Sequence, residues 1–294
     1  MDETKIRRRS GDRKDGRLIR SLPGFGNFIP FIMKDRNDAL VQYEESIEIS
    51  VVDKWLRAQR VNGYKGIGFL HFMIAAYIRC VAMFPGINRF IAGRRVFARY
   101  GIDIVMAVKK ELSLNAEETT IKVHFQPTDT IYDVYRKMNE QIAEIKANED
   151  DNGTEDFANA ITRLPRFLLS FAIWVLKVMD FFGILPDAWT EVSPFHGSMI
   201  ITDMGSLRMG PVYHHIYNFG TLPAFIAIGS KYHKYEVNKK AQVEDHKYID
   251  AKYVIDERIC DGHYYATFFQ AMRYLAKHPE VLETPPSKVN RDIL

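Results

Sequence analysis

Residues 253–275 constrain the fold more than any other part of the chain. They begin with a strand-like apolar run, pass through a cluster of charged residues to Asp261 and Gly262, and continue with apolar residues three or four positions apart. That spacing is typical of an amphipathic helix, and Asp-Gly marks a turn. The segment is therefore predicted to be a strand-to-helix junction. Taken alone, such a turn is either a solvated connection or a place where reactive groups are displayed.

The turn of this junction, residues 256–262, reads Asp-Glu-Arg-Ile-Cys-Asp-Gly. It resembles the Asp-His-Arg-x-x-Asp-Gly signature of the acyltransferase component of 2-oxo acid dehydrogenase complexes. Chloramphenicol acetyltransferase shares that fold and has a closely similar His-x-x-x-Asp-Gly. Every position of the signature fits except the one that carries the chemistry, because Glu257 stands where the family has its catalytic histidine.

Two further blocks resemble the same family in the same order. Residues 68–108 read as a long apolar helix ended by Pro-Gly, a short hairpin and a strand, and residues 198–229 contain Ser-Met-Ile-Ile-Thr-Asp-Met-Gly and Ala-Phe-Ile-Ala-Ile-Gly. The resemblance covers about residues 28–285 and is weak over 110–195. It implies an α/β two-layer sandwich of the chloramphenicol acetyltransferase type. We expect one such domain over 28–285, a basic, flexible or subunit-wrapping arm over 1–27, and a tail over 286–294.

The family transfers an acyl group between coenzyme A and a second thiol or hydroxyl. A histidine takes the thiol proton, and a serine or threonine hydroxyl stabilises the oxyanion. The hydroxyl position falls on Thr202, which could also be an ordinary β-branched strand residue. Asp261 matches an aspartate that braces the active-site turn by pairing with an arginine, and the sequence leaves open which arginine. The resemblance implies coenzyme A as a substrate, and no lipoyl domain is expected on this chain.

The glutamate makes proton transfer harder without forbidding it. A thiol of pKa about 8.5 gives its proton to an imidazole of pKa about 6.5 at a cost of about 2.7 kcal/mol, and to a carboxylate of pKa about 4.3 at about 5.7 kcal/mol. The difference of about 3 kcal/mol is at most on the order of a hundredfold in rate. Two hypotheses follow: an acyltransferase with an altered or lost base, and a non-catalytic oligomeric scaffold or regulatory paralogue of an acyltransferase.

Other histidines offer substitute bases. We expect His263 to face outward at the start of a helix and His196 to lie in a turn. His214 and His215 are neighbours, so on a strand at most one could reach a site. No histidine or cysteine spacing is that of a metal site, so no metal is expected.

Assembly is implied by the same resemblance. In the family, the base of one subunit faces the hydroxyl of its neighbour, which implies a homotrimer or a multiple of three. Glu257 and Thr202 are then expected to meet across a subunit interface, with a small-molecule acyl donor and acceptor between them.

Composition limits the remaining partners. The chain has 294 residues and a formal net charge of only +3, and Asp12 and Asp15 interrupt its basic N-terminal cluster. No nucleic-acid partner is expected. Its two cysteines, Cys80 and Cys260, are far apart in sequence and suggest no disulfide framework, so a cytoplasmic location is the default expectation.

The most apolar stretch is residues 164–185. Its longest uncharged run, residues 167–176, is about half of the ~20 residues that a membrane-spanning helix needs. We expect a helix pair packed on the protein, partly at a subunit contact, and its aromatic content leaves membrane-surface contact as the less favoured alternative.

Local patterns predict the nearby elements. Residues 44–52 alternate as a half-buried strand, after which Asp53 is expected to cap a helix. Residues 119–125 form another alternating strand. Asp129 is expected to cap a helix that runs to about residue 148, followed by an exposed acidic loop at 149–153.

Overall fold

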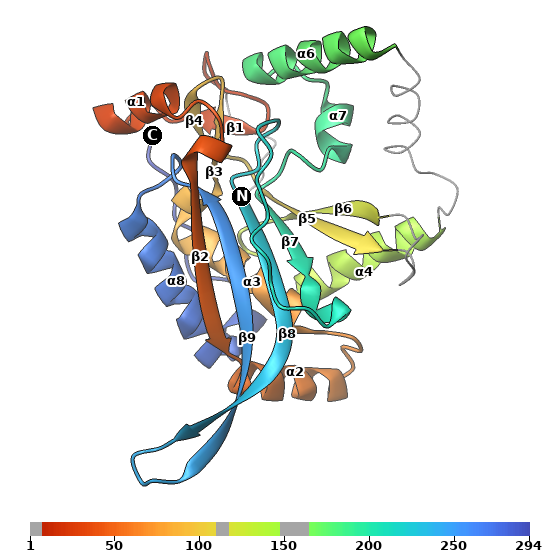
Figure 1. Ribbon diagram of the computed structural model, residues 1–294, viewed down its shortest axis with the longest axis vertical. Helices are drawn as coiled ribbons and strands as arrows, with labels where there is room; N and C mark the ends of the chain where they lie inside the picture. Colours follow the sequence, from red (N-terminus) through yellow and green to blue (C-terminus); the bar gives the residue numbers. More distant parts are fainter. Residues whose placement is uncertain (1–7, 110–117, 148–164) are drawn as a thin grey trace.

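The centre of the molecule is a six-stranded mixed sheet (Figure 1). The computed structural model describes residues 8–109, 118–147 and 165–294, so the predicted acidic loop at 149–153 lies outside the described residues. Strand β7 runs parallel to both of its neighbours, and the other pairs are antiparallel. In spatial order the strands are β2 (Leu40–Glu48), β9 (Val243–Asp256), β8 (Ala224–Val237), β7 (Met199–Asp203), β5 (Ile102–Lys109) and β6 (Glu118–Phe125).

Helices cover one face of this sheet. They are α2 (Ser50–Val61), α3 (Phe69–Met83), α4 (Ile131–Ala147) and α8 (Gly262–Lys277), with the short helix η5 (Pro279–Glu283) beside them. Residues 72–82 of α3 are all buried, as expected of a helix that is apolar on every side. Alternate strand residues such as Ile201, Ile226 and Tyr253 pack against these helices. The expected α/β two-layer sandwich is thereby confirmed.

The opposite face of the sheet carries a smaller apolar cluster. Ile200, Phe225 and Val254 lie side by side on neighbouring strands, and Ile216 and Leu222 of the connection before β8 cover them. The period of two along β7 places Thr202 on this same face, opposite α2, α3, α4 and α8.

A small antiparallel sheet stands at one end of the molecule. It contains β1 (Gly16–Leu18), β4 (Arg95–Arg99) and β3 (Arg89–Ala92), which follows the short helix η3 (Pro85–Asn88). The N-terminal segment, expected to be a flexible or subunit-wrapping arm, supplies β1 and then α1 (Gly24–Ile32) in this chain. The last residue, Leu294, accepts backbone hydrogen bonds from Arg20 and Ser21. Domain limits at 27 and 285 stay a prediction.

Two helices before β7 are largely exposed. Helix α6 (Arg166–Phe182) is followed by α7 (Asp187–Val192), and only Asp180 of α6 is buried. Within the single chain, α6 packs at its C-terminal end, where Asp180 binds Arg13 and Gly220, and the expected packing at a subunit contact stays a prediction. None of the helices in the described residues is long and apolar enough to cross a membrane.

Two helix starts differ from the sequence-based expectation. Strand β2 ends at Glu48, where its pairing with β9 stops, and α2 begins at Ser50, so Asp53 lies inside the helix. In α4 the cap is Thr130 instead of Asp129, because the Thr130 hydroxyl accepts from the backbone N–H of Asp133 and the Asp133 carboxylate accepts from that of Thr130. The remaining short helices are η2 (Asn37–Ala39) and η4 (Met204–Leu207).

Candidate functional site

The turn between β9 and α8 is anchored by a buried ion pair. The Asp256 carboxylate is fully buried and accepts from Nε and Nη2 of Arg258 at 2.8 and 2.7 Å. The backbone N–H of Arg258 donates to the same carboxylate at 3.1 Å. Three charge-assisted or backbone hydrogen bonds across two residues leave this turn little freedom.

A second arginine lies behind the pair. The Nε of Arg36 is 4.0 Å from the Asp256 carboxylate, and its other nitrogens donate to backbone carbonyls that include Ile91 and Gly220. Complete burial lowers the pKa of Arg36 to about 10; Asp256 opposes this shift, and the like charge of Arg258 adds to it. Arg258 also donates to the Met33 carbonyl, so the turn is tied to the segment after α1.

Asp261 begins helix α8. Its Oδ1 accepts from the backbone N–H of Tyr264 at 2.8 Å, and its backbone is extended, which is the geometry of an N-cap. Arg258, the nearest arginine in the sequence, pairs with Asp256 and leaves Asp261 to the cap. The sequence did not single out Asp256 or Arg36 as bracing residues, although the Asp-x-Arg spacing at 256–258 carries a signal for the first. A role of Asp261 in catalysis stays a prediction.

Glu257 is the exposed residue between these two buried partners. Its backbone N–H donates to the Ala39 carbonyl at 2.9 Å, which joins the turn to η2. Among the described residues the Glu257 carboxylate has no hydrogen-bond or ion-pair partner. The backbone of this position is fixed, whereas its carboxylate is presented outward.

Thr202 lies far from Glu257 in the same chain. The strand register aligns Thr202 with Ala227 of β8 and Lys252 of β9, and Glu257 follows Lys252 by five positions. Five residues of strand span roughly 16 Å, and two strand spacings lie between as well. One chain therefore does not bring these two residues together, and their meeting across a subunit interface stays a prediction.

The Thr202 hydroxyl makes a weak contact within its own chain. It contacts Met204 Sδ at 3.9 Å, and the Thr202 side chain is half-buried. Gly205, which strengthens the resemblance, has a packing reason of its own, because a Cβ there would lie 2.7 Å from the Gly229 carbonyl oxygen. Burial raises the pKa of the neighbouring Asp203 above its ordinary value.

The other histidines lie in different environments. His263 is exposed, as expected. His196 is buried, with Nδ1 2.8 Å from Ser193 Oγ and Nε2 3.3 Å from Asp180 Oδ1. His214 stacks on the ring of Phe225 at 4.3 Å in a segment that is not a strand, so its expected alternation with His215 does not apply. The described residues hold no cluster of metal-ligating side chains.

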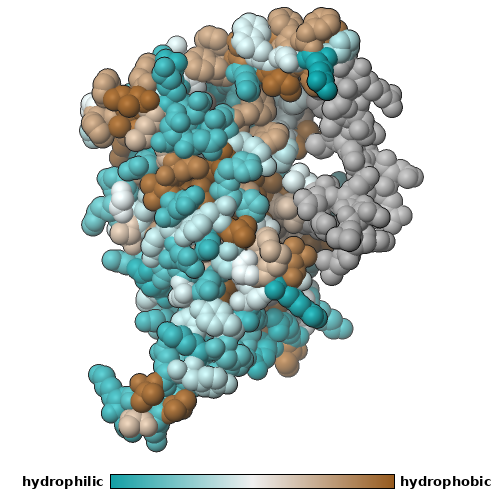
Figure 2. All heavy atoms as spheres, in the orientation of Figure 1, coloured by the Kyte–Doolittle hydropathy of each residue, from teal (hydrophilic) through white to brown (hydrophobic). Residues whose placement is uncertain are grey.

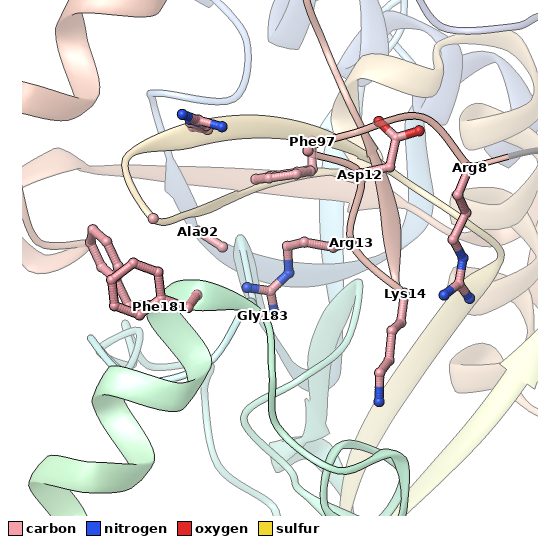
Figure 3. A pocket seen from close by; sticks show the side chains of 12 residues that line it. Arg8, Asp12, Arg13, Lys14, Ala92, Phe97, Phe181 and Gly183 are labelled. Atoms are coloured by element: carbon pink, nitrogen blue, oxygen red, sulfur yellow. The ribbon is translucent and has the colours of Figure 1, made fainter.

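Two cavities flank the turn between β3 and β4. One, of about 370 Å³, is lined by Arg36 and Arg258 of the buried cluster and by Lys177 of α6, and Glu257 is not among its lining residues. The other, of about 320 Å³, is shown in Figure 3, where Arg13 points toward Gly183 at the end of α6. Both cavities are rich in basic side chains.

Comparison of the sequence with family models and with curated proteins finds no match. Solved structures do match. A probable dihydrolipoamide acetyltransferase from Listeria monocytogenes aligns at a TM-score of 0.55 and 15% identity, over 87% of this chain and 93% of that one. The fold is that of a dihydrolipoamide acetyltransferase catalytic core.

Other catalytic cores of this acyltransferase fold align with the chain to a similar extent. The dihydrolipoamide acetyltransferase of Azotobacter vinelandii aligns at a TM-score of 0.55 and 14% identity, over 90% of this chain and 94% of that one. A truncated catalytic core of the 2-oxoacid dehydrogenase complex from Thermoplasma acidophilum aligns at 0.55 and 13%, over 89% and 98%. The acyltransferase fold thus extends over nearly the whole chain, including regions where the sequence resemblance is weak.

Proposed function

We propose that this chain is an acyltransferase-type protein that transfers an acyl group between coenzyme A and a thiol or hydroxyl acceptor, with Glu257 in place of the histidine base. The observation that carries the proposal is how the side chains of the turn between β9 and α8 are arranged. Buried Asp256 and Arg258 fix its backbone, and the Glu257 carboxylate is left exposed without a partner among the described residues. Because this carboxylate is exposed and is not engaged by a cation among the described residues, it is accessible to accept a proton from a substrate.

The step requires a proton acceptor and an oxyanion donor. The Glu257 carboxylate takes the proton of the acceptor thiol, and the thiolate attacks the carbonyl carbon of the acyl thioester. The Thr202 hydroxyl donates to the oxyanion of the tetrahedral intermediate. The intermediate then collapses, the bond to the sulfur of coenzyme A breaks, and that sulfur takes the proton back from Glu257. No external oxidant or reductant is needed.

The proposed step uses two chains. Thr202 and Glu257 are roughly 16 Å apart along the strands of one chain, so the proposal takes the hydroxyl from a neighbouring copy. The proposal therefore includes a homotrimer or a multiple of three, an arrangement in which each interface supplies one complete site. The competing proposal is a scaffold that keeps this assembly without turnover.

The test is acyl transfer from acetyl-CoA to dihydrolipoamide by the parent, Glu257→His and Glu257→Gln. We expect Glu257→His to be faster by up to about a hundredfold, the difference set by about 3 kcal/mol of proton affinity. Glu257→Gln should be slower than the parent. Native mass spectrometry of the same samples with acetyl-CoA reports the number of chains and any bound ligand.

A matched control is Glu144→His, which makes the same exchange on the exposed face of α4. It should leave the rate unchanged. If the parent and both Glu257 variants form the same assembly but neither bind acetyl-CoA nor transfer the acyl group, the enzyme proposal fails and the scaffold stands.

A further inference from the structure

Helix α6 is anchored at one end and exposed along the rest of its length. Its one buried residue, Asp180, binds the Arg13 guanidinium and the backbone N–H of Gly220. Its large apolar side chains remain exposed: Phe167 is 72% exposed, Phe171 61%, Trp174 58% and Phe182 68%. Phe167, Phe171 and Trp174 are spaced at i, i+4 and i+7, so they share one face of the helix. An apolar face of this kind normally packs against something.

Helix α1 presents a similar face. Phe25 is 73% exposed, Phe28 56%, Phe31 52% and Ile32 60%. The two helices stand at the same end of the molecule, on either side of the β3–β4 hairpin (Figure 1), and brown apolar side chains gather over both (Figure 2).

The turn of the β3–β4 hairpin connects the two faces. The guanidinium carbon of Arg94 lies 5.7 Å from the ring centre of Phe31 in α1. On the other side, Gly93 fits closely against the end of α6, because a Cβ there would lie 2.7 Å from the Phe181 carbonyl oxygen. Helix α1, this turn and helix α6 therefore form one continuous end surface, which we name the aromatic end.

Basic side chains interleave with these aromatic residues. Lys34, Arg94 and Lys177 line the cavity of about 370 Å³. Arg8, Lys14 and Arg95 line the cavity of about 320 Å³. Three acidic residues, Asp35, Asp12 and Asp180, also line these cavities, and Asp180 is held by Arg13. Even with Lys14 paired to Asp187, the surface keeps an excess of positive charge.

We propose that the aromatic end docks on an anionic phospholipid bilayer. The aromatic faces of α1 and α6 enter the boundary between headgroups and acyl chains, and Arg94 and Lys177 contact headgroup phosphates. Aromatic and aliphatic side chains on one face, with Lys and Arg beside them, are the composition of helices that lie in the plane of a membrane. With 17 residues and three charges, α6 is suited to lie on a bilayer and not to span it.

Charge distinguishes this occupant from a second copy of the chain. The core of a protein interface is depleted in charged residues. Here, a basic turn divides the two apolar faces, and the same turn would repel the equivalent turn of a second copy facing it. An anionic bilayer instead offers acyl chains to the apolar side chains and headgroup phosphates to the basic ones.

The experiment is flotation of the full chain with vesicles of phosphatidylcholine alone and of phosphatidylcholine mixed with phosphatidylglycerol. We expect binding to the mixed vesicles, and at least about tenfold weaker binding for the double variant Phe171→Ser with Trp174→Ser, because two large apolar side chains no longer enter the bilayer. The double variant Arg94→Glu with Lys177→Glu should lose on the order of tenfold on mixed vesicles and be unchanged on neutral ones.

The tip of the β8–β9 hairpin supplies a matched control. Tyr235 is 70% exposed and Val237 71%, and this hairpin projects from the opposite end of the molecule (Figure 1). The double variant Tyr235→Ser with Val237→Ser should bind vesicles as the parent does. The proposal is overturned if this control weakens binding as much as the α6 variant does, or if the parent binds neither vesicle. It is also overturned if the α6 variant changes only the sedimentation coefficient, which would assign the face to a second copy.

A second measurement, the fluorescence emission of Trp174, leaves the residues of the aromatic end unchanged. In the double variant Trp55→Phe with Trp189→Phe, Trp174 is the remaining tryptophan, and its emission should shift to shorter wavelength when mixed vesicles are added. An unchanged emission with vesicles present would contradict the proposal even if the chain sediments with them.

Discussion

Arg258 donates two hydrogen bonds to the carboxylate of Asp256, two residues before it, and both side chains are buried. The residue between them, Glu257, is the exposed one of the three. A rigid turn with one free carboxylate is the local arrangement from which the proposed chemistry starts.

Removing the buried anion should cost much of the stability of the fold. In Asp256→Asn, both Arg258 and Arg36 lose their compensating charge, and we expect a loss of about 3–5 kcal/mol in the free energy of unfolding. Urea titration measures this loss. Adding Arg258→Met to Asp256→Asn should recover part of it, because one uncompensated cation is removed.

Asp187→Asn is the control for that measurement, since Asp187 pairs with Lys14 at an exposed site. Its expected loss is about 0–1 kcal/mol. Equal losses at the two positions would show that the buried pair does not fix the turn.

The cap of α8 predicts a smaller effect. Asp261→Ala removes the acceptor for the Tyr264 N–H and should cost about 1 kcal/mol of stability, whereas Asp261→Ser should restore most of it. Thermal unfolding of the parent, Asp261→Ala and Asp261→Ser measures these differences in stability. A serine variant as unstable as the alanine variant would mean that the charge of Asp261 matters beyond capping.

Acid should weaken the contact between α2 and the β8–β9 hairpin. Burial alone would raise the pKa of Asp53, but hydrogen bonds and charge from Lys231 and Lys247 outweigh it and lower the pKa from 3.8 to about 2. Because the folded-state pKa is below the unfolded one, Asp53 contributes stability above the unfolded value, and this contribution is lost as the pH falls toward about 2.

Asp53→Asn should therefore be less stable than the parent at neutral pH, with a difference that narrows between about pH 4 and pH 2. Urea titrations over this range measure it. A difference that stays constant across the range would contradict the assignment.

Thr202 is tested by separating its shape from its hydroxyl. If it stabilises the oxyanion, Thr202→Val should lower kcat by about 10²- to 10³-fold with little change in stability, and Thr202→Ser should retain most of the rate. If the parent is too slow to measure, the same Thr202 substitutions are compared in the Glu257→His variant. Equal rates for the valine and serine variants would leave Thr202 an ordinary strand residue.

Features with a local cause were predictable from the sequence. The β9–α8 junction, the apolar helix α3 and strands β5 and β6 follow from short-range periodicity and lie where they were expected. The start of α2 was missed because the end of β2 is set by its pairing with β9, about 200 residues away in the chain.

Pairs that form over long distances were not predictable in the same way. The approach of Arg36 to Asp256 and of Arg13 to Asp180 depends on the packing of segments far apart in sequence. The exposure of α6 was missed for a related reason. Hydrophobicity shows that a helix face needs a cover, but it does not show whether the cover belongs to the same chain.

The strand register that separates Thr202 from Glu257 has a kinetic consequence. If the two residues act together, no single chain contains a complete site, so the rate per chain depends on protein concentration. When the protein is diluted below the dissociation constant of its assembly, its specific activity should fall more steeply than in proportion to the dilution. A mixture of Glu257→Gln chains with Thr202→Val chains should be more active than either variant alone, because some of its interfaces contain both an intact Glu257 and an intact Thr202.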